Sequence, residues 1–300
     1  MASQQLLQIL FFMLLCTSMA INPEAEALLR WKSTLANSSL SSWSLANAIC
    51  SWFGITCDST GHVTVLDLSF KGLNGTLDAF YSTAYQNLTR INLSNNNLVG
   101  TIPANMSMLL TLTFLDLSSN SFSGAIPYQL IHLSRIATLN LGNNHLTNPE
   151  YGKFSPMLDL KFLLLANNDL TGTSPWLILN STGPRLSVLD LSANDFSGHI
   201  PYSLPEMAPR LRILNVSYNG FSGPIPRSLP RFKELQALDL YSNNLTGVIS
   251  EELGMISGLK YLVLGYNLLG GSIPASLGKL QMLQTLDISS NDIVSTLPLE

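Results

Sequence analysis

Residue types that commonly perform catalysis are present in this sequence, but their spacing matches no catalytic or metal-binding arrangement. The four histidines fall at unrelated positions, and none has a second His or Cys at the spacing of metal ligands. They are His62, His132, His145 and His199. No glycine-rich nucleotide loop, kinase signature or paired nucleophile and base occurs. We therefore predict that this chain is not an enzyme and binds neither a metal nor a cofactor. A protein kinase domain could follow in a longer product.

The side chains best suited to binding are tyrosines and two cations between residues 212 and 266. Their rings could contact apolar groups, their hydroxyls a peptide backbone, and the cations a carboxylate. They are Arg212, Tyr218, Tyr241, Lys260, Tyr261 and Tyr266. We predict that they form one patch that binds a peptide or protein. The alternative is that the tyrosines pack on one another and stiffen a sheet.

An internal repeat must position these residues. The pattern L-x-x-L-x-L-x-x-N-x-L-x-G-x-I-P returns about every 24 residues, most clearly in residues 112–127. The alternating leucines predict a short strand, and a strand that cannot cover its own apolar side must stack in parallel on the next repeat. Residues 61–300 hold about ten such repeats, the last incomplete. The fold class is thus an α/β solenoid with a parallel, concave β-sheet.

An asparagine follows each strand, where the chain turns inward. Its amide can bond to buried backbone groups that the turn leaves unpaired. The position recurs at Asn96, Asn120, Asn144, Asn168, Asn194, Asn219, Asn243, Asn267 and Asn291. The glycine and proline that come next permit a tight backbone and discourage long helices, so we expect turns and 3₁₀ segments on the convex side.

A row of acidic and amide residues follows the strand leucines on the expected concave face. It reads Asp67, Asn92, Asp116, Asn140, Leu164, Asp190, Asn215, Asp239, Val263 and Asp287. We interpret most of this row as a preference of the repeat, with ligand contact as the alternative. Phe114 and Phe162 depart from small polar residues on the same face, and repetition alone does not account for them.

The first 20 residues indicate secretion. They carry no charge, include the apolar stretch 6–16 and end in the small-x-small pattern of a signal-peptidase site. The alternative is a signal anchor, although the apolar run is shorter than a membrane-spanning helix. Cys50 and Cys57 remain after cleavage, and in an oxidising compartment we predict that they form a disulfide and are not free thiols.

The composition of the chain argues against nucleic acid as a partner. Charged residues make up 11% of the chain, the net charge is −4, and the scattered cations form no basic stripe for nucleic acid. Eight glycosylation sequons would help so weakly charged a surface stay soluble. They are Asn37, Asn74, Asn87, Asn92, Asn105, Asn180, Asn215 and Asn244. Glycans on Asn92 and Asn215 would obstruct part of the concave face.

Two departures from the repeat lie in its middle. The fourth repeat lacks the Gly-x-Ile-Pro segment across residues 146–153, and the step from Asn168 to Asn194 is two residues longer than usual, across residues 176–184. We interpret both as tolerated loop changes; a docking loop is the alternative.

The repeat resembles the plant-specific leucine-rich repeat. Residues 27–32, 40–43 and 50–57 resemble the N-terminal cap of plant receptor-like kinases and receptor-like proteins, and we assign residues 21–60 to this cap. Asn22 is a favourable helix N-cap before Pro23. No matching cap follows the last repeat, which predicts a fragment or truncated form of a longer receptor.

This resemblance implies an extracellular or cell-surface receptor domain, with roles in signalling or defence. It would recognise a peptide, a steroid-like signal or a partner receptor on its concave face, and a co-receptor kinase would be brought alongside. The alternative is a secreted inhibitor of microbial wall-degrading enzymes, similar to polygalacturonase-inhibiting proteins.

Overall fold

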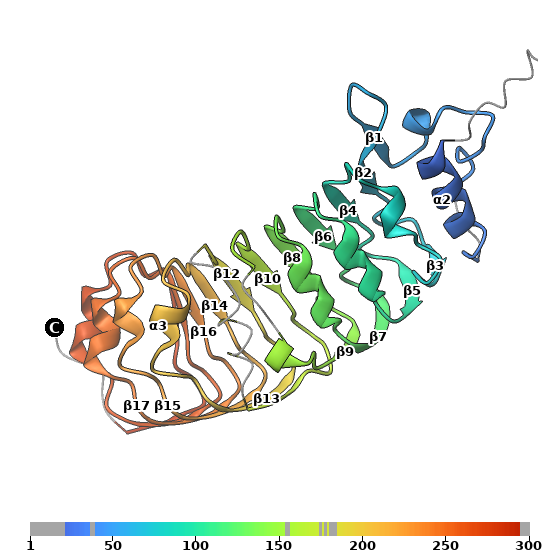
Figure 1. Cartoon of the computed structure of the whole chain (residues 1–300). Coiled ribbons are helices and arrows are strands. Elements are labelled where there is room, and N and C mark those ends of the chain that lie inside the picture. Colours follow the sequence, from blue (N-terminus) through green and yellow to red (C-terminus); the bar gives the residue numbers. More distant parts are fainter. Residues whose placement is uncertain are drawn as a thin grey trace, which may run out of the picture.

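One sheet runs the length of the molecule, and all of its strands except the first are parallel. The computed structural model describes residues 22–36, 40–153, 157–173, 176, 179 and 185–294; the predicted signal peptide lies outside them. Eleven strands line the concave face in the order in which they occur in the chain, as Figure 1 shows. They are β1 (Ile55–Cys57), β2 (Val63–Asp67), β4 (Arg90–Asn92), β6 (Phe114–Asp116), β8 (Thr138–Asn140), β10 (Phe162–Leu164), β12 (Val188–Asp190), β14 (Ile213–Asn215), β16 (Ala237–Asp239), β18 (Tyr261–Val263) and β20 (Thr285–Asp287).

The leucine pattern explains this sheet. In β6, Leu115 is fully buried, while the residues on either side of it point to the concave face and are half-buried. Leu115 stands in register with Ile91 of β4 and Leu139 of β8, so leucine and isoleucine side chains stack repeat on repeat in one continuous core. The predicted solenoid fold is confirmed.

The asparagine ladder is also confirmed. The amide nitrogen of Asn96 donates to the carbonyl oxygens of Leu68 and Leu93, both at 2.9 Å. Its amide oxygen accepts from the backbone nitrogens of Lys71 and Leu73, both at 3.0 Å. Each such asparagine therefore joins its own repeat to the preceding one through backbone groups that are buried from water.

Two smaller sheets on the flank were not predicted. One contains β3 (Asn74–Gly75), β5 (Asn97–Gly100), β7 (Ser121–Ala125) and β9 (His145–Thr147). The other contains β11 (Thr171–Gly172), β13 (Asp195–His199), β15 (Gly220–Pro224), β17 (Asn244–Val248), β19 (Leu268–Gly271) and β21 (Asp292–Ile293). They form because the backbone after each asparagine is extended and lies beside its copy in the next repeat.

The flank sheet is interrupted between β9 and β11, where the fourth repeat lacks its glycine segment. The Asn148 side chain bridges this gap: its nitrogen donates to the Thr171 hydroxyl at 2.8 Å and its oxygen accepts from the Thr171 backbone at 2.9 Å. Most of residues 176–184, where a longer loop was expected, lie outside the described residues.

The convex side carries short 3₁₀ helices, as predicted. They are η2 (Ser82–Ala84), η3 (Ala104–Met108), η4 (Tyr128–His132), η5 (Tyr151–Lys153), η7 (Leu229–Arg231), η8 (Glu251–Met255) and η9 (Ala275–Lys279). In the sixth repeat the corresponding segment is a single α-helical turn, α3 (Leu204–Met207), with Pro205 in its first turn, where no backbone donor is needed.

A helical cap covers the first repeat, at the blue end of Figure 1. Helix α2 (Pro23–Lys32) begins after Asn22, whose side-chain oxygen accepts from the backbone nitrogens of Glu24 and Ala25 at 2.9 and 3.2 Å. A 3₁₀ turn, η1 (Ile49–Ser51), leads into β1, which pairs antiparallel with β2. The predicted disulfide between Cys50 and Cys57 is present, with an S–S distance of 2.03 Å.

Candidate ligand-binding face

Two rows of side chains point to the concave face from the ten parallel strands β2 to β20, one on each side of the buried central residue. We call the residues after it the acid–amide row; these are the ten residues from Asp67 to Asp287 given above. We call the residues before it the mixed row. The mixed row reads Val65, Arg90, Phe114, Thr138, Phe162, Val188, Ile213, Ala237, Tyr261 and Thr285.

Hydrogen bonds within the sheet engage much of the acid–amide row. The amide nitrogen of Asn140 donates to the Asp116 carboxylate at 3.1 Å, and Asp116 also accepts from the Ser118 hydroxyl at 2.6 Å. Asn92 donates to Asp67 in the same way, at 3.3 Å. Alternation of acid and amide keeps the carboxylates two strands apart, about 10 Å. These bonds are internal to the repeat and require no ligand.

The mixed row is more apolar and more exposed. Phe162 and Ile213 are each 39% exposed and Tyr261 is 44% exposed. Phe114 is covered differently, because the Arg90 guanidinium lies over its ring at 3.5 Å from the centroid. The face therefore presents a line of apolar side chains beside a line of polar ones.

Three of the six predicted binding residues pack together. The ring centroids of Tyr218 and Tyr241 lie 5.3 Å apart, and those of Tyr241 and Tyr266 lie 5.1 Å apart. We call these three residues the tyrosine ladder. Tyr218 and Tyr266 remain 57% and 55% exposed although their rings contact Tyr241. The tyrosines thus pack on one another, as the alternative interpretation expected, and still offer ring surface to a partner.

The other three predicted residues are not joined to the ladder. Two nitrogens of the Arg212 guanidinium bond to the Glu234 carboxylate at 2.8 and 2.9 Å, so this cation is already paired. Tyr261 stands in the mixed row between Ala237 and Thr285, and Lys260 precedes it. Among the described residues, no ring contact or ion pair links Lys260 or Tyr261 to the ladder. The predicted patch therefore divides into separate parts.

The sequence interpretation did not single out Asp239, the acid beside the ladder. Burial raises the pKa of its carboxyl, the Tyr241 backbone N–H lowers it, and the carboxylates of Asp190 and Asp287 raise it further. The signal that could have identified it is the tyrosine at position 241, where most repeats have a small residue, usually serine.

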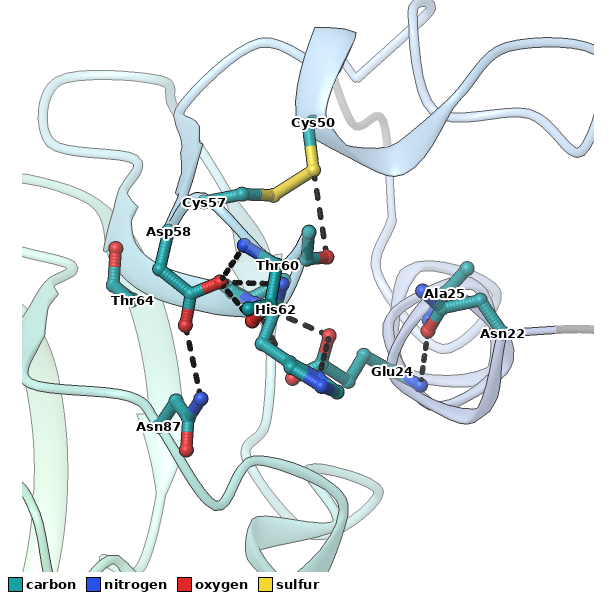
Figure 2. Close-up of polar contacts among 12 residues, drawn as sticks. Asn22, Glu24, Ala25, Cys50, Cys57, Asp58, Thr60, His62, Thr64 and Asn87 are labelled. Atoms are coloured by element: carbon teal, nitrogen blue, oxygen red, sulfur yellow. Dashed lines mark hydrogen bonds and ion pairs between the residues drawn. A yellow bond between two sulfur atoms is a disulfide. The ribbon is translucent and has the colours of Figure 1, made fainter.

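The cap contains a second polar cluster, shown in Figure 2. The buried Glu24 carboxylate accepts from the Val63 backbone nitrogen at 3.1 Å, and the His62 imidazole lies 3.8 Å away. Asp58 accepts from Thr60 and, at 2.9 Å, from the amide of Asn87. Hydrogen bonds from Thr60 and Asn87 hold the pKa of Asp58 well below its usual range. These bonds hold the cap against the first repeats.

Glu24 predicts a pH dependence of the cap. Burial raises the pKa of Glu24, against opposing effects of the Val63 N–H and His62, so the folded state binds the proton more tightly than the unfolded state. The stability from this protonation is complete below the ordinary glutamate pKa and is lost as pH rises through the raised pKa. We expect Glu24→Gln, which keeps an acceptor for Val63, to remove this loss. Urea midpoints from pH 4 to 7, followed by tryptophan fluorescence, test it; parallel profiles for both proteins would contradict it.

The predicted sequons differ in accessibility. Asn37 and Asn180 lie outside the described residues. Asn74, Asn105 and Asn244 are exposed, on β3, η3 and β17, away from the concave rows. The remaining three are half-buried: Asn87, Asn92 and Asn215. The side-chain oxygens of Asn92 and Asn215 accept from the hydroxyls of the serines two residues later, at 2.8 and 2.7 Å.

The described parts of the chain contain neither a cluster of metal ligands nor a helix that could cross a membrane. No three His, Cys, Asp or Glu side chains there gather as the ligands of a metal ion would. No helix in those ranges has both the length and the apolar character needed to cross a membrane.

Family profiles match most of the chain. The leucine rich repeat N-terminal domain matches residues 21–58. Leucine rich repeat profiles match residues 87–109, 111–133, 185–207, 210–232 and 233–293. The chain belongs to the leucine-rich-repeat family. Its relatives include receptor-like protein kinase 7 of Arabidopsis thaliana, which is 38% identical over 115 residues, or 37% of this chain and 12% of the relative. Receptor-like protein 6 of the same plant is 42% identical over 33% of this chain and 10% of the relative.

Solved leucine-rich-repeat structures resemble the fold. The ectodomain of the plant membrane receptor kinase GASSHO1/SCHENGEN3 from Arabidopsis thaliana, in complex with CASPARIAN STRIP INTEGRITY FACTOR 2, has a TM-score of 0.84 and 36% identity over 92% of this chain and 33% of that chain. A plant ice-binding protein has a TM-score of 0.83 and 29% identity, covering 92% of this chain and 89% of that one. The BIR2 ectodomain from Arabidopsis thaliana has a TM-score of 0.51 and 31% identity over 57% of this chain and 92% of that chain. The chain thus spans about a tenth of its curated relatives and a third of the GASSHO1/SCHENGEN3 ectodomain.

Proposed function

We propose that this chain is the extracellular ligand-binding region of a plant receptor-like kinase or receptor-like protein, and that it binds a peptide or protein on its concave face. The exposed apolar side chains of the mixed row carry this proposal. Phe162, Ile213 and Tyr261 lie on the inner side of a sheet whose core is otherwise filled, so their exposure does not serve packing.

Similarity to plant receptor relatives supports the proposal. Both curated relatives described above are receptor-like proteins, and the GASSHO1/SCHENGEN3 ectodomain was solved with a bound partner. A receptor of this kind would pass its signal by bringing a co-receptor kinase alongside. The ice-binding neighbour has the same fold with a different ligand, so the fold alone does not assign the function.

Glycosylation of the exposed sequons would suit this role. Glycans on Asn74, Asn105 and Asn244 would cover the flank and convex side and leave the concave rows open. Asn92 and Asn215 are hydrogen-bonded within the acid–amide row, where a glycan would obstruct the sheet.

Selection from a random dodecapeptide display library tests the proposed binding face. The secreted chain would be the bait, and the selected peptides would be measured against two matched double variants. Ile213→Asp with Tyr261→Asp alters the mixed row, whereas Val248→Asp with Leu268→Asp alters comparably exposed positions on the flank. We expect the first to weaken binding at least tenfold, about 1.4 kcal/mol, and the second to leave it unchanged.

Loss of peptide binding only in the flank variant would contradict the proposal that peptides bind to the concave face. Failure to select any peptide, together with inhibition of a purified fungal polygalacturonase by the chain, would favour a secreted inhibitor.

A further inference from the structure

The Asp239 carboxylate accepts fewer side-chain hydrogen bonds than any other acid of its row. The carboxylates of Asp116 and Asp190 each accept from a serine hydroxyl two residues later, at 2.6 Å in both cases. Asp67 and Asp287 do the same, at 2.8 and 2.6 Å. Two residues after Asp239 stands Tyr241, and only its backbone nitrogen donates, at 3.0 Å. The Asp239 carboxylate therefore lacks the hydroxyl donor that its counterparts have.

No cation neutralises this carboxylate. Within the described ranges, no Lys, Arg or His nitrogen forms an ion pair with Asp239; Arg212, which precedes the neighbouring strand β14, is held by Glu234. In register with Asp239 stand Asn215 of β14 and Val263 of β18. Val263 has no polar side chain. The Asn215 side-chain oxygen accepts from the Ser217 hydroxyl, so only the Asn215 amide nitrogen could donate to Asp239, and the described residues show no such bond. A half-buried carboxylate thus faces the concave side with a backbone donor but, among the described residues, without a cation or a side-chain donor.

The tyrosine ladder is linked to Asp239 through the backbone of Tyr241. Tyr241 is the middle ring and is tied to Asp239 through its backbone nitrogen. The outer rings, Tyr218 and Tyr266, are more than half exposed. Both occupy a left-handed backbone position, with φ of 53° and 55°, where the other repeats have mostly asparagine or serine. Aromatic faces next to a carboxylate attract a cation through the ring quadrupole and the charge together.

We propose that Asp239 and the tyrosine ladder bind an arginine side chain of an extended partner peptide. A guanidinium is planar, so it can lie against a tyrosine ring while its donors reach the carboxylate in pairs; an ammonium group offers neither the flat face nor the paired donors. This inference rests on the proposed concave binding face and adds the chemistry of the ligand. It differs from the sequence-based expectation of a ligand carboxylate bound by Arg212, whose guanidinium is held by Glu234.

A defined probe tests the site without a known ligand. The peptide acetyl-Gly-Arg-Gly-amide would be titrated into the secreted chain and compared with its citrulline analogue, which has the same shape and no charge. Tyrosine ring signals in NMR spectra would report binding. We expect the arginine peptide to bind about tenfold more tightly than the citrulline peptide in the unaltered protein.

Asp239→Asn should remove this preference. The fold accepts asparagine in this row, since Asn92, Asn140 and Asn215 occupy equivalent positions. The control is Asp116→Gln, which removes the charge of an acid that has its serine hydroxyl and lies away from the ladder; asparagine at this position would complete a glycosylation sequon with Ser118. We expect the control to keep the arginine preference and Asp239→Asn to bind both peptides equally.

Tyr241→Ser provides a second, independent variant. It introduces the residue that six other repeats use at this position, supplies the missing hydroxyl to Asp239 and removes the middle ring. We expect it also to lose the arginine preference. Equal binding of both peptides to the unaltered protein, or a preference that survives in Asp239→Asn, would overturn the proposal.

These outcomes separate the two proposals. Display peptides that bind the concave face, with no arginine preference in the titration, would leave the proposed function standing and overturn the arginine site. An Asp239-dependent arginine preference, with binding of the display peptides confined to the flank, would leave the arginine site standing and overturn the proposed function.

Discussion

Replacing Asn243 by alanine is expected to lower the free energy of unfolding by about 3–5 kcal/mol. The buried amide of Asn243 donates to the carbonyl oxygens of Val216 and Leu240 at 3.0 and 3.2 Å, and accepts from the Phe221 backbone nitrogen at 3.0 Å. Alanine would leave these groups buried without partners, and each unpaired group costs about 1–3 kcal/mol.

Ser242→Ala is the matched control for this prediction. Ser242 precedes Asn243, has a positive φ of 53°, and corresponds to Ala193 in an earlier repeat, which has a φ of 51°. Alanine is therefore compatible with this backbone, and we expect a change within about 0.5 kcal/mol. Urea unfolding followed by circular dichroism measures both variants, and hydrogen exchange at Phe221 should accelerate only in Asn243→Ala. Equal midpoints for the two variants would show that the ladder contributes little.

Replacing Trp43 by alanine is expected to open the cap, at a cost of about 3–5 kcal/mol. The side chain is 1% exposed, its ring stacks on Trp52 with centroids 5.5 Å apart, and it lies 6.4 Å from the Trp31 ring. The indole nitrogen donates to the Phe53 carbonyl at 2.9 Å, so the substitution also removes a partly buried hydrogen bond.

Tryptophan fluorescence can follow this opening, since three of the four tryptophans lie in the cap. We expect an early transition in urea that involves the cap, before the repeats unfold. Leu45→Ala is the control, because Leu45 lies nearby and is 62% exposed. A single transition at the original midpoint in Trp43→Ala would refute a stabilising role for this packing.

The outcome at the candidate site shows where sequence reasoning succeeded. Repetition placed Tyr218, Tyr241 and Tyr266 on adjacent repeats, and the structure brings their rings into contact. The pairing of Arg212 with Glu234 was not foreseen, although both residues are visible in the sequence. Their contact depends on how two neighbouring repeats align, and the leucine period does not specify where long side chains meet.

The sequence by itself determined the solenoid, its strands, the asparagine ladder and the disulfide of the cap. Each of these features follows from contacts that recur at every repeat or lie within a short segment, so the residue pattern is sufficient to predict it. Only the tertiary structure decided the flank sheets and the unpaired state of Asp239. The flank sheets require the extended segments of adjacent repeats to lie side by side. The state of Asp239 depends on residues from neighbouring strands, and on which donors and cations they fail to provide.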